Sequence, residues 1–245
     1  MRVNVLGVSF DPVSPGEAVL RGREMLSSGK GCYVVTPNPE IVFAARKDEK
    51  YAEVISKADL VLADGIGVVY ASKILGGTPL QRNPGFEFAE SMLLYAAGNA
   101  LPVYLLGGKA GVAEAAAENL KKKYPGLVIC GTRDGYFLPG EPVAEDIARS
   151  GAALVFVCLG FPKQEFWMAE NRYKTGAALH IGLGGTLDIF AGNLRRAPES
   201  WQKRGLEWLY RLLKEPRRIK RQWKLPFFLL LAVCARLRGK GRRDA

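Results

Sequence analysis

The 245-residue chain is 48% hydrophobic and 24% charged, which excludes a disordered protein and leaves enough apolar residues for one large α/β domain, alone or with an appendage. Its net charge is +11, but residues 195–245 hold 16 Lys/Arg and 4 Asp/Glu, while residues 1–194 hold 19 and 20. All of the excess positive charge therefore lies at the C-terminal end, and we expect that segment to bind a polyanion.

Short apolar runs with β-forming composition alternate with segments of helical spacing. The runs are Val3–Val8, Cys32–Thr36, Leu60–Ala63, Val103–Leu106, Leu127–Gly131, Leu154–Leu159 and Ala178–Leu183, and the clearest helical segments are Ala110–Tyr124 and Pro142–Ser150. This alternation predicts an α/β, Rossmann-like fold with a mainly parallel sheet and helices on both faces. Ligands of such sheets bind beyond the carboxyl ends of the strands, so the polar residues there are the candidate site. We place a catalytic domain at residues 1–194 and a basic helical appendage at residues 195–245.

The first 60 residues contain one such strand end, Thr36-Pro37-Asn38-Pro39-Glu40. The prolines restrict the backbone on either side of Asn38, which holds its short polar side chain at the mouth of the sheet. Asn38 is also a good N-cap residue for a helix that begins with proline, and the two roles are compatible. The N-terminal Met1–Phe10 lacks a long apolar segment and is expected to be a first strand, with no signal peptide evident.

The next strand end is Ala63-Asp64-Gly65, which is followed by the segment 80–87. A carboxylate directly after a buried strand is suited to act as a general base, although Asp64 could instead cap the following helix. Arg82 is a cation among apolar residues, and its forked donors suit a phosphate or carboxylate. The alternative for Arg82 is a surface salt bridge.

Two later strand ends complete the candidate site. In Leu159–Glu165, Gln164 could hydrogen-bond sugar hydroxyls, or be an ordinary residue of the first helical turn. The glycines of Gly182–Asp188 permit close approach of a diphosphate or ring. His180, the only histidine, falls in mid-strand and is expected to be a core residue. The four cysteines have no CxxC spacing and are expected to be reduced core residues of a cytosolic protein.

Several motifs are missing from the sequence. Residues 106–110 lack P-loop spacing, and no G-x-G-x-x-G follows the first strand, which argues against an ATPase or a dinucleotide-binding enzyme. No D-x-D pair is present to hold a divalent metal against a nucleotide diphosphate, so we expect neither a metal nor another cofactor. Protein cations would then have to stabilise any diphosphate that leaves in the reaction.

The appendage supplies such cations. Arg211, Arg218 and Arg221 have spacings that place them on one helical face, although Pro216 interrupts the segment. The apolar run Leu225–Leu237 is shorter than the ~20 residues of a spanning helix, so we expect it to lie in a membrane surface without crossing. We prefer an anionic membrane over a nucleic acid as the partner, because phosphate binding alone does not require an apolar run.

The chain resembles the WecG/TagA/CpsF glycosyltransferases. The matching segments, in family order, are TPNPE (36–40), ADG (63–65), QRNPGFE (81–87), LLGGKAGVAE (105–114), YPGL (124–127), GTRDGYF (131–137), LGFPKQE (159–165), GLGGTLDIFAG (182–192) and RAPESWQKRGLEWLYRLLKEPRR (196–218). The resemblance implies an inverting, metal-independent transfer in which Asp64 is the base. It also implies that Thr36, Asn38 and Gln164 line the sugar pocket, that Arg82 is a further cation of the site, and that Arg211, Arg218 and Arg221 close over the diphosphate at the membrane.

Within the matching segments we expect nucleotide contacts from Gly107, Gly108, Tyr136, Gly184 and Asp188. The resemblance favours N-acetylmannosamine, passed from UDP to undecaprenyl-diphosphate-linked N-acetylglucosamine in teichoic acid linkage-unit synthesis. The alternatives are another donor (N-acetylmannosamine uronic acid or glucose) in surface polysaccharide synthesis, or a nucleotide-binding oxidoreductase. We expect a cytoplasmic protein bound peripherally to the inner face of the membrane. The sequence leaves the oligomeric state open, and a homo-oligomer is compatible with it.

Overall fold

The structure is a computed structural model that describes residues 1–198, 200–201, 207, 209–210 and 224–239. The strands are β1 (Val3–Val5), β2 (Val8–Phe10), β3 (Cys32–Val35), β4 (Leu60–Val61), β5 (Val103–Gly107), β6 (Ile129–Arg133), β7 (Leu154–Cys158) and β8 (Leu179–Gly182). The helices include α1 (Pro15–Ser28), α2 (Pro39–Ala45), α3 (Glu49–Ser56), α4 (Ile66–Leu75), α5 (Gly85–Gly98), α6 (Val112–Lys123), α7 (Val143–Arg149), α8 (Lys163–Asn171), α9 (Thr186–Phe190) and α13 (Lys224–Leu237).

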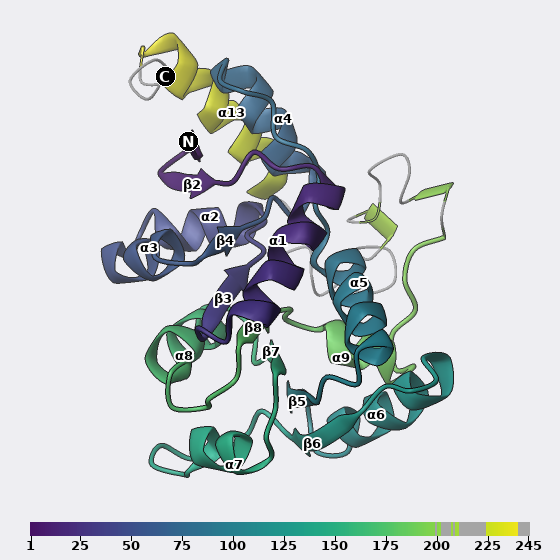
Figure 1. Ribbon diagram of the computed structural model, residues 1–245. Coiled ribbons are helices and arrows are strands. Elements are labelled where there is room, and N and C mark those ends of the chain that lie inside the picture. Colours follow the sequence, from purple (N-terminus) through teal and green to yellow (C-terminus); the bar gives the residue numbers. More distant parts are fainter. Residues whose placement is uncertain (199, 202–206, 208, 211–223, 240–245) are drawn as a thin grey trace.

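Six strands form one parallel sheet in the order β4-β3-β8-β7-β5-β6 (Figure 1). Every strand predicted from Cys32 onward contributes to it, and the two clearest predicted helices are α6 and α7. The predicted α/β, Rossmann-like class is therefore confirmed. Because all six strands run in the same direction, their carboxyl ends lie at one edge of the sheet, where a ligand site is expected.

Helices cover both faces of the sheet. Neighbouring residues of a strand point to opposite faces, so Val34 packs in one apolar cluster and Val35 in the other. The first cluster includes buried residues of α1, α5, α6 and α9, and the second includes those of α2, α3, α4, α7, α8 and α13. Burial on both sides explains why the inner strands are almost wholly apolar, whereas the edge strand β6 is partly buried and includes Thr132 and Arg133.

The predicted first strand, Val3–Val8, is wrong as a member of this sheet. The run is broken into the antiparallel hairpin β1–β2, with Leu6 and Gly7 as its two-residue turn. Both residues have positive φ (54° and 98°), and Asn4 Oδ1 accepts a hydrogen bond from the Gly7 N–H at 2.9 Å. Such a turn matches the twist of a tight hairpin, and the glycine adopts its conformation without strain.

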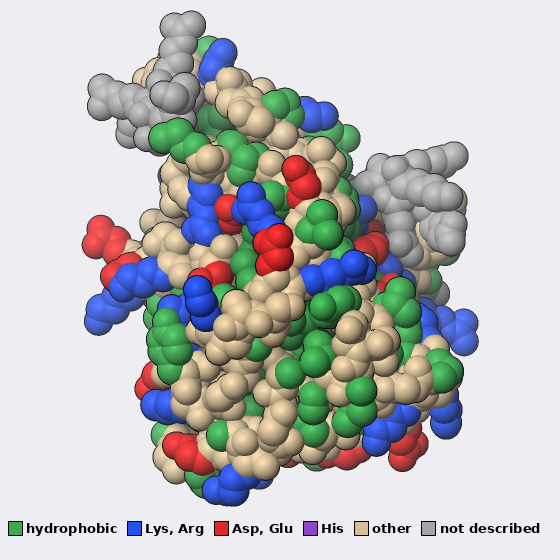
Figure 2. Space-filling view, viewed as in Figure 1, with side chains coloured by type: hydrophobic (Ala, Val, Ile, Leu, Met, Phe, Trp, Pro, Cys, Tyr) green, Lys and Arg blue, Asp and Glu red, His purple; other side chains and the backbone are tan. Residues whose placement is uncertain are grey.

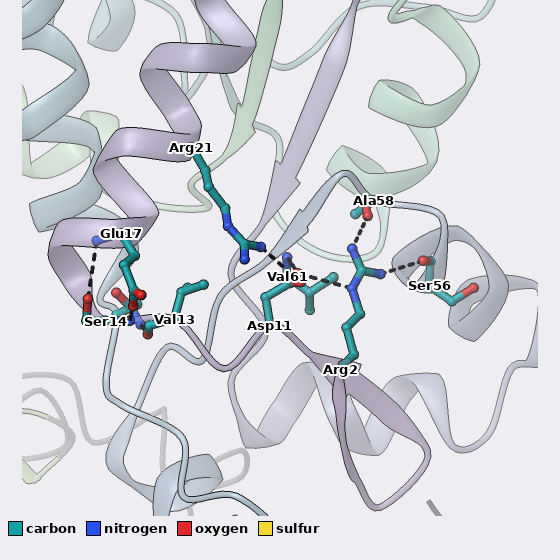
Figure 3. A network of polar contacts seen from close by, with 10 residues as sticks. Arg2, Asp11, Val13, Ser14, Glu17, Arg21, Ser56, Ala58 and Val61 are labelled. Carbon is teal, nitrogen blue, oxygen red and sulfur yellow. Dashed lines mark hydrogen bonds and ion pairs between the residues drawn. The ribbon is translucent and has the colours of Figure 1, made fainter. Parts of the chain in front are cut away.

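A polar network ties this hairpin to the edge of the main sheet (Figure 3). Asp11 accepts from Arg2 Nε at 3.1 Å and from the Val61 N–H of edge strand β4 at 2.8 Å. The Arg2 guanidinium also donates to the carbonyls of Ser56 and Ala58. The exposed edge of β4 is thereby capped, which removes a site for unwanted strand pairing.

The C-terminal helix α13 lies alongside α4 (Figure 1) and packs against α2. Phe228 and Ala232 are fully buried in the cluster that includes α2 and α4, and the Phe228 ring lies edge-on to Phe43 at 5.5 Å between centroids. At the other end of α13, the Arg236 guanidinium donates to Leu75 O at 2.7 Å and so caps α4. The predicted C-terminal helix is therefore present, and one of its sides belongs to the core.

Much of the predicted appendage, residues 195–245, lies outside the described residues. Among the described residues, no helix combines the length and apolar character needed to cross a bilayer. On the face in Figure 2, acidic and basic side chains are interspersed, in keeping with the near-neutral balance of residues 1–194. The boundary at residues 194/195 stays a prediction.

Candidate active site

The end of β3 supplies two of the predicted sugar-pocket residues. Asn38 is the N-cap of α2, and its Oδ1 accepts from the N–H groups of Glu40 at 2.9 Å and Ile41 at 3.1 Å. The capping role is thus observed. Thr36 is buried, and its hydroxyl donates to Gly182 O at the end of β8 at 3.2 Å. The ends of β3 and β8 are therefore linked at the predicted pocket.

Asp64 lies beside this cap. Its N–H donates to Pro37 O at 3.2 Å, and its side chain is partly buried. The N-cap of α4 is Gly65, with φ of 102°, so Asp64 is not the N-cap residue. A Cβ on Gly65 would lie 3.8 Å from the Cβ of Asn38, which shows how closely the two strand ends approach. The role of Asp64 as a general base stays a prediction.

The segment that carries Arg82 is fastened to the same strand ends. The Asn83 N–H donates to Ala63 O at 2.9 Å, and a Cβ on Gly85 would meet Thr36 Oγ1 at 3.1 Å. Arg82 forms an ion pair with Glu207 of the predicted appendage at 2.9 Å, and both side chains are largely buried. The salt-bridge alternative for Arg82 is thus partly right, although the partner is not a neighbouring surface residue.

Glu207 belongs to a network that the sequence analysis did not identify. Its second oxygen lies 3.8 Å from Arg196 Nε, and Arg196 in turn donates to Glu87 at 2.6 Å and covers the Phe86 ring at 4.2 Å. These contacts join the region after residue 194 to the start of α5. The sequence shows that these residues carry opposite charges. It does not show that they pair, because Arg82 and Glu207 are 125 positions apart and Glu87 and Arg196 are 109 apart.

Gln164 lies in the first turn of α8 and is buried. Its Oε1 accepts from the Gly184 N–H at 2.9 Å, and its Nε2 donates to Glu165 Oε1 at 2.8 Å. Glu165 Oε2 also accepts from the Tyr51 hydroxyl at 3.0 Å. Burial raises the pKa of Glu165, against the hydrogen bonds from Gln164 and Tyr51. Glu165 and Tyr51 are further residues that the sequence analysis missed.

The predicted nucleotide contacts lie at strand ends and in nearby loops. Gly107 and Gly108 have positive φ (128° and 76°), and a Cβ on Gly107 would be 2.2 Å from Cys158 O. Close packing therefore accounts for Gly107 without a ligand. Tyr136 is 77% exposed, and Asp188 lies partly buried on the short helix α9. Nucleotide contacts from these residues and from Gly184 stay a prediction.

His180 is a core residue, as predicted. It is fully buried in β8, with Thr175 Oγ1 2.7 Å from Nε2 and Cys32 O 3.1 Å from Nδ1. Burial lowers its pKa to about 4. All four cysteines are free thiols, and burial raises the pKa of Cys158 to about 12. Neither His180 nor Cys158 is therefore available for acid–base chemistry near neutral pH.

The structure brings Thr36, Asn38, Asp64 and Gln164 to the carboxyl ends of β3, β4 and β8, together with the segment that carries Arg82. Within the described ranges, no group of three or more His, Cys, Asp or Glu side chains could hold a metal ion. Arg211, Arg218 and Arg221 lie outside the described residues. The described site thus offers a carboxylate, a cation and polar groups that suit hydroxyls.

A sequence profile described as "Glycosyl transferase WecG/TagA/CpsF family" matches residues 3–242. Three relatives share the name N-acetylglucosaminyldiphosphoundecaprenol N-acetyl-beta-D-mannosaminyltransferase. The chain is 40% identical to the one from Bacillus spizizenii and 39% identical to the one from Bacillus subtilis, in each case over 83% of this chain and 79% of the relative. It is 35% identical to the one from Staphylococcus aureus, over 93% of this chain and 91% of the relative. These names do not favour the oxidoreductase alternative. The chain belongs to the WecG/TagA/CpsF family of glycosyltransferases.

Proposed function

We propose that this enzyme moves N-acetylmannosamine from UDP to undecaprenyl-diphosphate-linked N-acetylglucosamine, with inversion and without a metal ion, in teichoic acid linkage-unit synthesis. The observation that carries the proposal is the 35–40% identity to three relatives with the corresponding name, over at least four fifths of this chain. The grouping of Thr36, Asn38, Asp64 and Gln164 at one edge of the sheet supports it.

The reaction needs one proton transfer and one displacement. The Asp64 carboxylate takes the proton of the acceptor hydroxyl as that oxygen attacks the anomeric carbon, and the bond from this carbon to UDP breaks. Attack from the face opposite to UDP inverts the configuration. Thr36, Asn38 and Gln164 hold the sugar, while Arg82 contributes positive charge to the site.

The departing diphosphate needs further positive charge. Arg211, Arg218 and Arg221 are the cations that we assign to it, with Gly107, Gly108, Tyr136, Gly184 and Asp188 around the nucleotide. The ion pair between Arg82 and Glu207 supports this assignment, because it joins the beginning of the arginine-rich segment to the candidate site. Preorganised cations at a leaving phosphate stabilise the charge that develops there.

The lipid-linked acceptor calls for a position at the membrane, and we assign the contact to α13 and the basic segment before it. Four large apolar side chains of α13 are exposed, with exposed fractions of 40% or more: Phe227, Leu230, Val233 and Leu237. Exposed apolar side chains beside a concentration of Lys and Arg suit the interface of an anionic bilayer. On this proposal the enzyme is peripheral and acts at the inner face of the cytoplasmic membrane.

The test of the reaction uses purified enzyme, a water-soluble analogue of the diphosphate-linked acceptor and a panel of UDP-sugars. The expected outcome is transfer from UDP-N-acetylmannosamine, a β-linked product by NMR, and the same rate with saturating EDTA. A clear preference for another donor would overturn the substrate assignment. Activity lost to EDTA and restored by Mg²⁺ or Mn²⁺ would overturn the metal-independent mechanism.

The same acceptor separates two roles of the basic segment. Arg211→Ala, Arg218→Ala and Arg221→Ala should each impair transfer to the soluble acceptor, because the diphosphate loses a cation whether or not a membrane is present. Full-length enzyme should bind anionic vesicles, more weakly as salt is added. If the three variants matched wild type on the soluble acceptor and failed only on vesicles, the arginines would serve only to attach the enzyme to the membrane.

A further inference from the structure

A chain of buried polar side chains connects α3 to the loop that follows β8. Tyr51 and Glu165 are each 1% exposed and Gln164 is 3% exposed. The hydrogen bonds run from the Tyr51 hydroxyl to Glu165 Oε2, from Gln164 Nε2 to Glu165 Oε1, and from the Gly184 N–H to Gln164 Oε1, at 3.0, 2.8 and 2.9 Å. Only the last two involve a residue assigned to the sugar pocket.

These neighbours define the orientation of the Gln164 amide. A backbone N–H can only donate, so the group facing Gly184 must be the carbonyl oxygen of Gln164. With the oxygen at Gly184, the NH₂ of Gln164 faces Glu165 and donates to its Oε1. The opposite orientation would set two donors against each other at Gly184. Among the described residues the side chain of Gln164 makes these two hydrogen bonds, which leaves one N–H and one lone pair of the amide for a substrate.

Glu165 is a costly residue for this position if its role is only to fill the core. Its carboxylate is buried, and its two side-chain partners, Tyr51 and Gln164, are both neutral. Burial of a carboxylate without a cation disfavours the charged form, and an apolar side chain of similar volume is often at least as stabilising. A carboxyl group at this position is explained by the hydrogen bond that it accepts from the Gln164 amide.

We propose that Glu165, held by Tyr51, is a positioning residue that fixes the amide of Gln164 in the single orientation able to bind the donor sugar. Glu165 does not touch the substrate. The inference rests on the proposed function in one respect, that Gln164 contacts the sugar part of the UDP-sugar. On this inference, the donor specificity of the pocket depends on the hydrogen bond from Gln164 Nε2 to Glu165 Oε1, in which Glu165 has no contact with the substrate.

The experiment is a double-mutant cycle with Gln164→Ala, Glu165→Leu and the combined variant. Turnover is measured with the soluble acceptor, and binding of UDP-N-acetylmannosamine and of UDP is measured separately by calorimetry. Gln164→Ala should lower kcat/KM about 10–100-fold, the effect of one lost polar contact. Glu165→Leu should approach this loss in the wild-type background and change the Gln164→Ala enzyme less than twofold. UDP affinity should stay within about twofold throughout, because UDP lacks the sugar.

Two milder variants and a matched control keep the test independent of folding. Glu165→Gln allows either end of its amide to face Gln164, and Tyr51→Phe removes one hydrogen bond to the carboxylate, so both should give smaller losses of the same kind. Tyr33 is an equally buried tyrosine, and its hydroxyl donates to Val54 O on α3, which does not belong to the hydrogen-bond network of Tyr51, Glu165 and Gln164. Tyr33→Phe is therefore the control. It should lower the Tm and leave kcat/KM unchanged.

The outcomes separate this inference from the proposed function. If Glu165→Leu lowered kcat/KM as strongly with Gln164→Ala as without it, or weakened UDP binding equally, Glu165 would not act through Gln164 and the inference would fail. If Gln164→Ala matched wild type in turnover and in UDP-sugar binding, the assignment of Gln164 to the pocket would fail, and the inference with it. If wild type bound UDP-N-acetylmannosamine but transferred nothing, the proposed reaction would fail, and the binding cycle would still measure the effect of Glu165.

Discussion

Replacement of Phe228 by alanine tests whether α13 is part of the folded core in the absence of lipid. Phe228 is fully buried, packs edge-on to Phe43 and lies among the apolar residues of α2 and α4. Truncation of such a phenylalanine removes its burial energy and leaves a cavity, at a cost of about 3–5 kcal/mol in the free energy of unfolding. At about 2–4 °C per kcal/mol for a chain of this size, the Tm should fall by about 6–20 °C.

The assay is urea unfolding of the lipid-free protein, followed by circular dichroism, with Leu230→Ala as the matched control. Leu230 lies on the same helix but is 54% exposed, so its truncation should change the free energy of unfolding by about 0.5 kcal/mol or less. A Phe228→Ala protein that unfolds at the wild-type urea concentration would refute the packing of α13. Deletion of residues 195–245 extends the test, because a truncated chain with wild-type stability would establish 194/195 as a folding boundary.

Three further predictions concern the site and the core. Asp64→Asn should lower transfer by about 10²–10⁴-fold with UDP affinity little changed, and near-normal turnover would remove its role as the base. Glu207→Gln should lower kcat/KM roughly tenfold, because Arg82 loses the charged partner 2.9 Å away, and an unchanged or raised kcat/KM would contradict this. Burial lowers the pKa of His180 to about 4, so the unfolded chain binds more protons between about pH 6.5 and 4. Urea unfolding should show about 3 kcal/mol of stability lost as the pH falls through that range, and a slope unchanged in His180→Gln would show another cause.

The sheet could be predicted from the sequence because its strands carry their own signal. From Cys32 onward each predicted run falls on a strand, and the inner strands β3, β8, β7 and β5 are mostly apolar because they are buried on both faces. The first run was predicted wrongly because Leu6 and Gly7 form a turn within a mainly apolar segment, and apolar periodicity does not indicate the φ angle of a leucine. The composition favours a strand, but the positive φ angles of Leu6 and Gly7 divide the segment into two strands.

Individual residues of the candidate site could be predicted from the sequence, but the hydrogen bonds and ion pairs between them could not. Asp64 and Gln164 follow strands, where a parallel sheet gathers its ligands. Tyr51 and Glu165 are 114 positions apart, and Arg82 and Glu207 are 125 apart. Nothing local distinguishes a glutamate that holds an amide in a buried network from one on a solvated helix face. Such pairings arise only when tertiary packing brings the elements together.

Helix α4 links the proposed catalytic base to the proposed membrane contact. It begins two residues after Asp64, and its last carbonyl, Leu75 O, accepts a hydrogen bond from Arg236 of α13, which packs along it. A Cβ on Gly76, just after α4, would lie 2.3 Å from the Arg236 guanidinium, so glycine permits this close contact. Ten residues of α-helix span about 15 Å. If α13 lies on the bilayer, α4, which packs along it, fixes the position of Asp64 relative to that surface. The packing of α13 against α4 would then determine how far the acceptor must reach from that surface to Asp64.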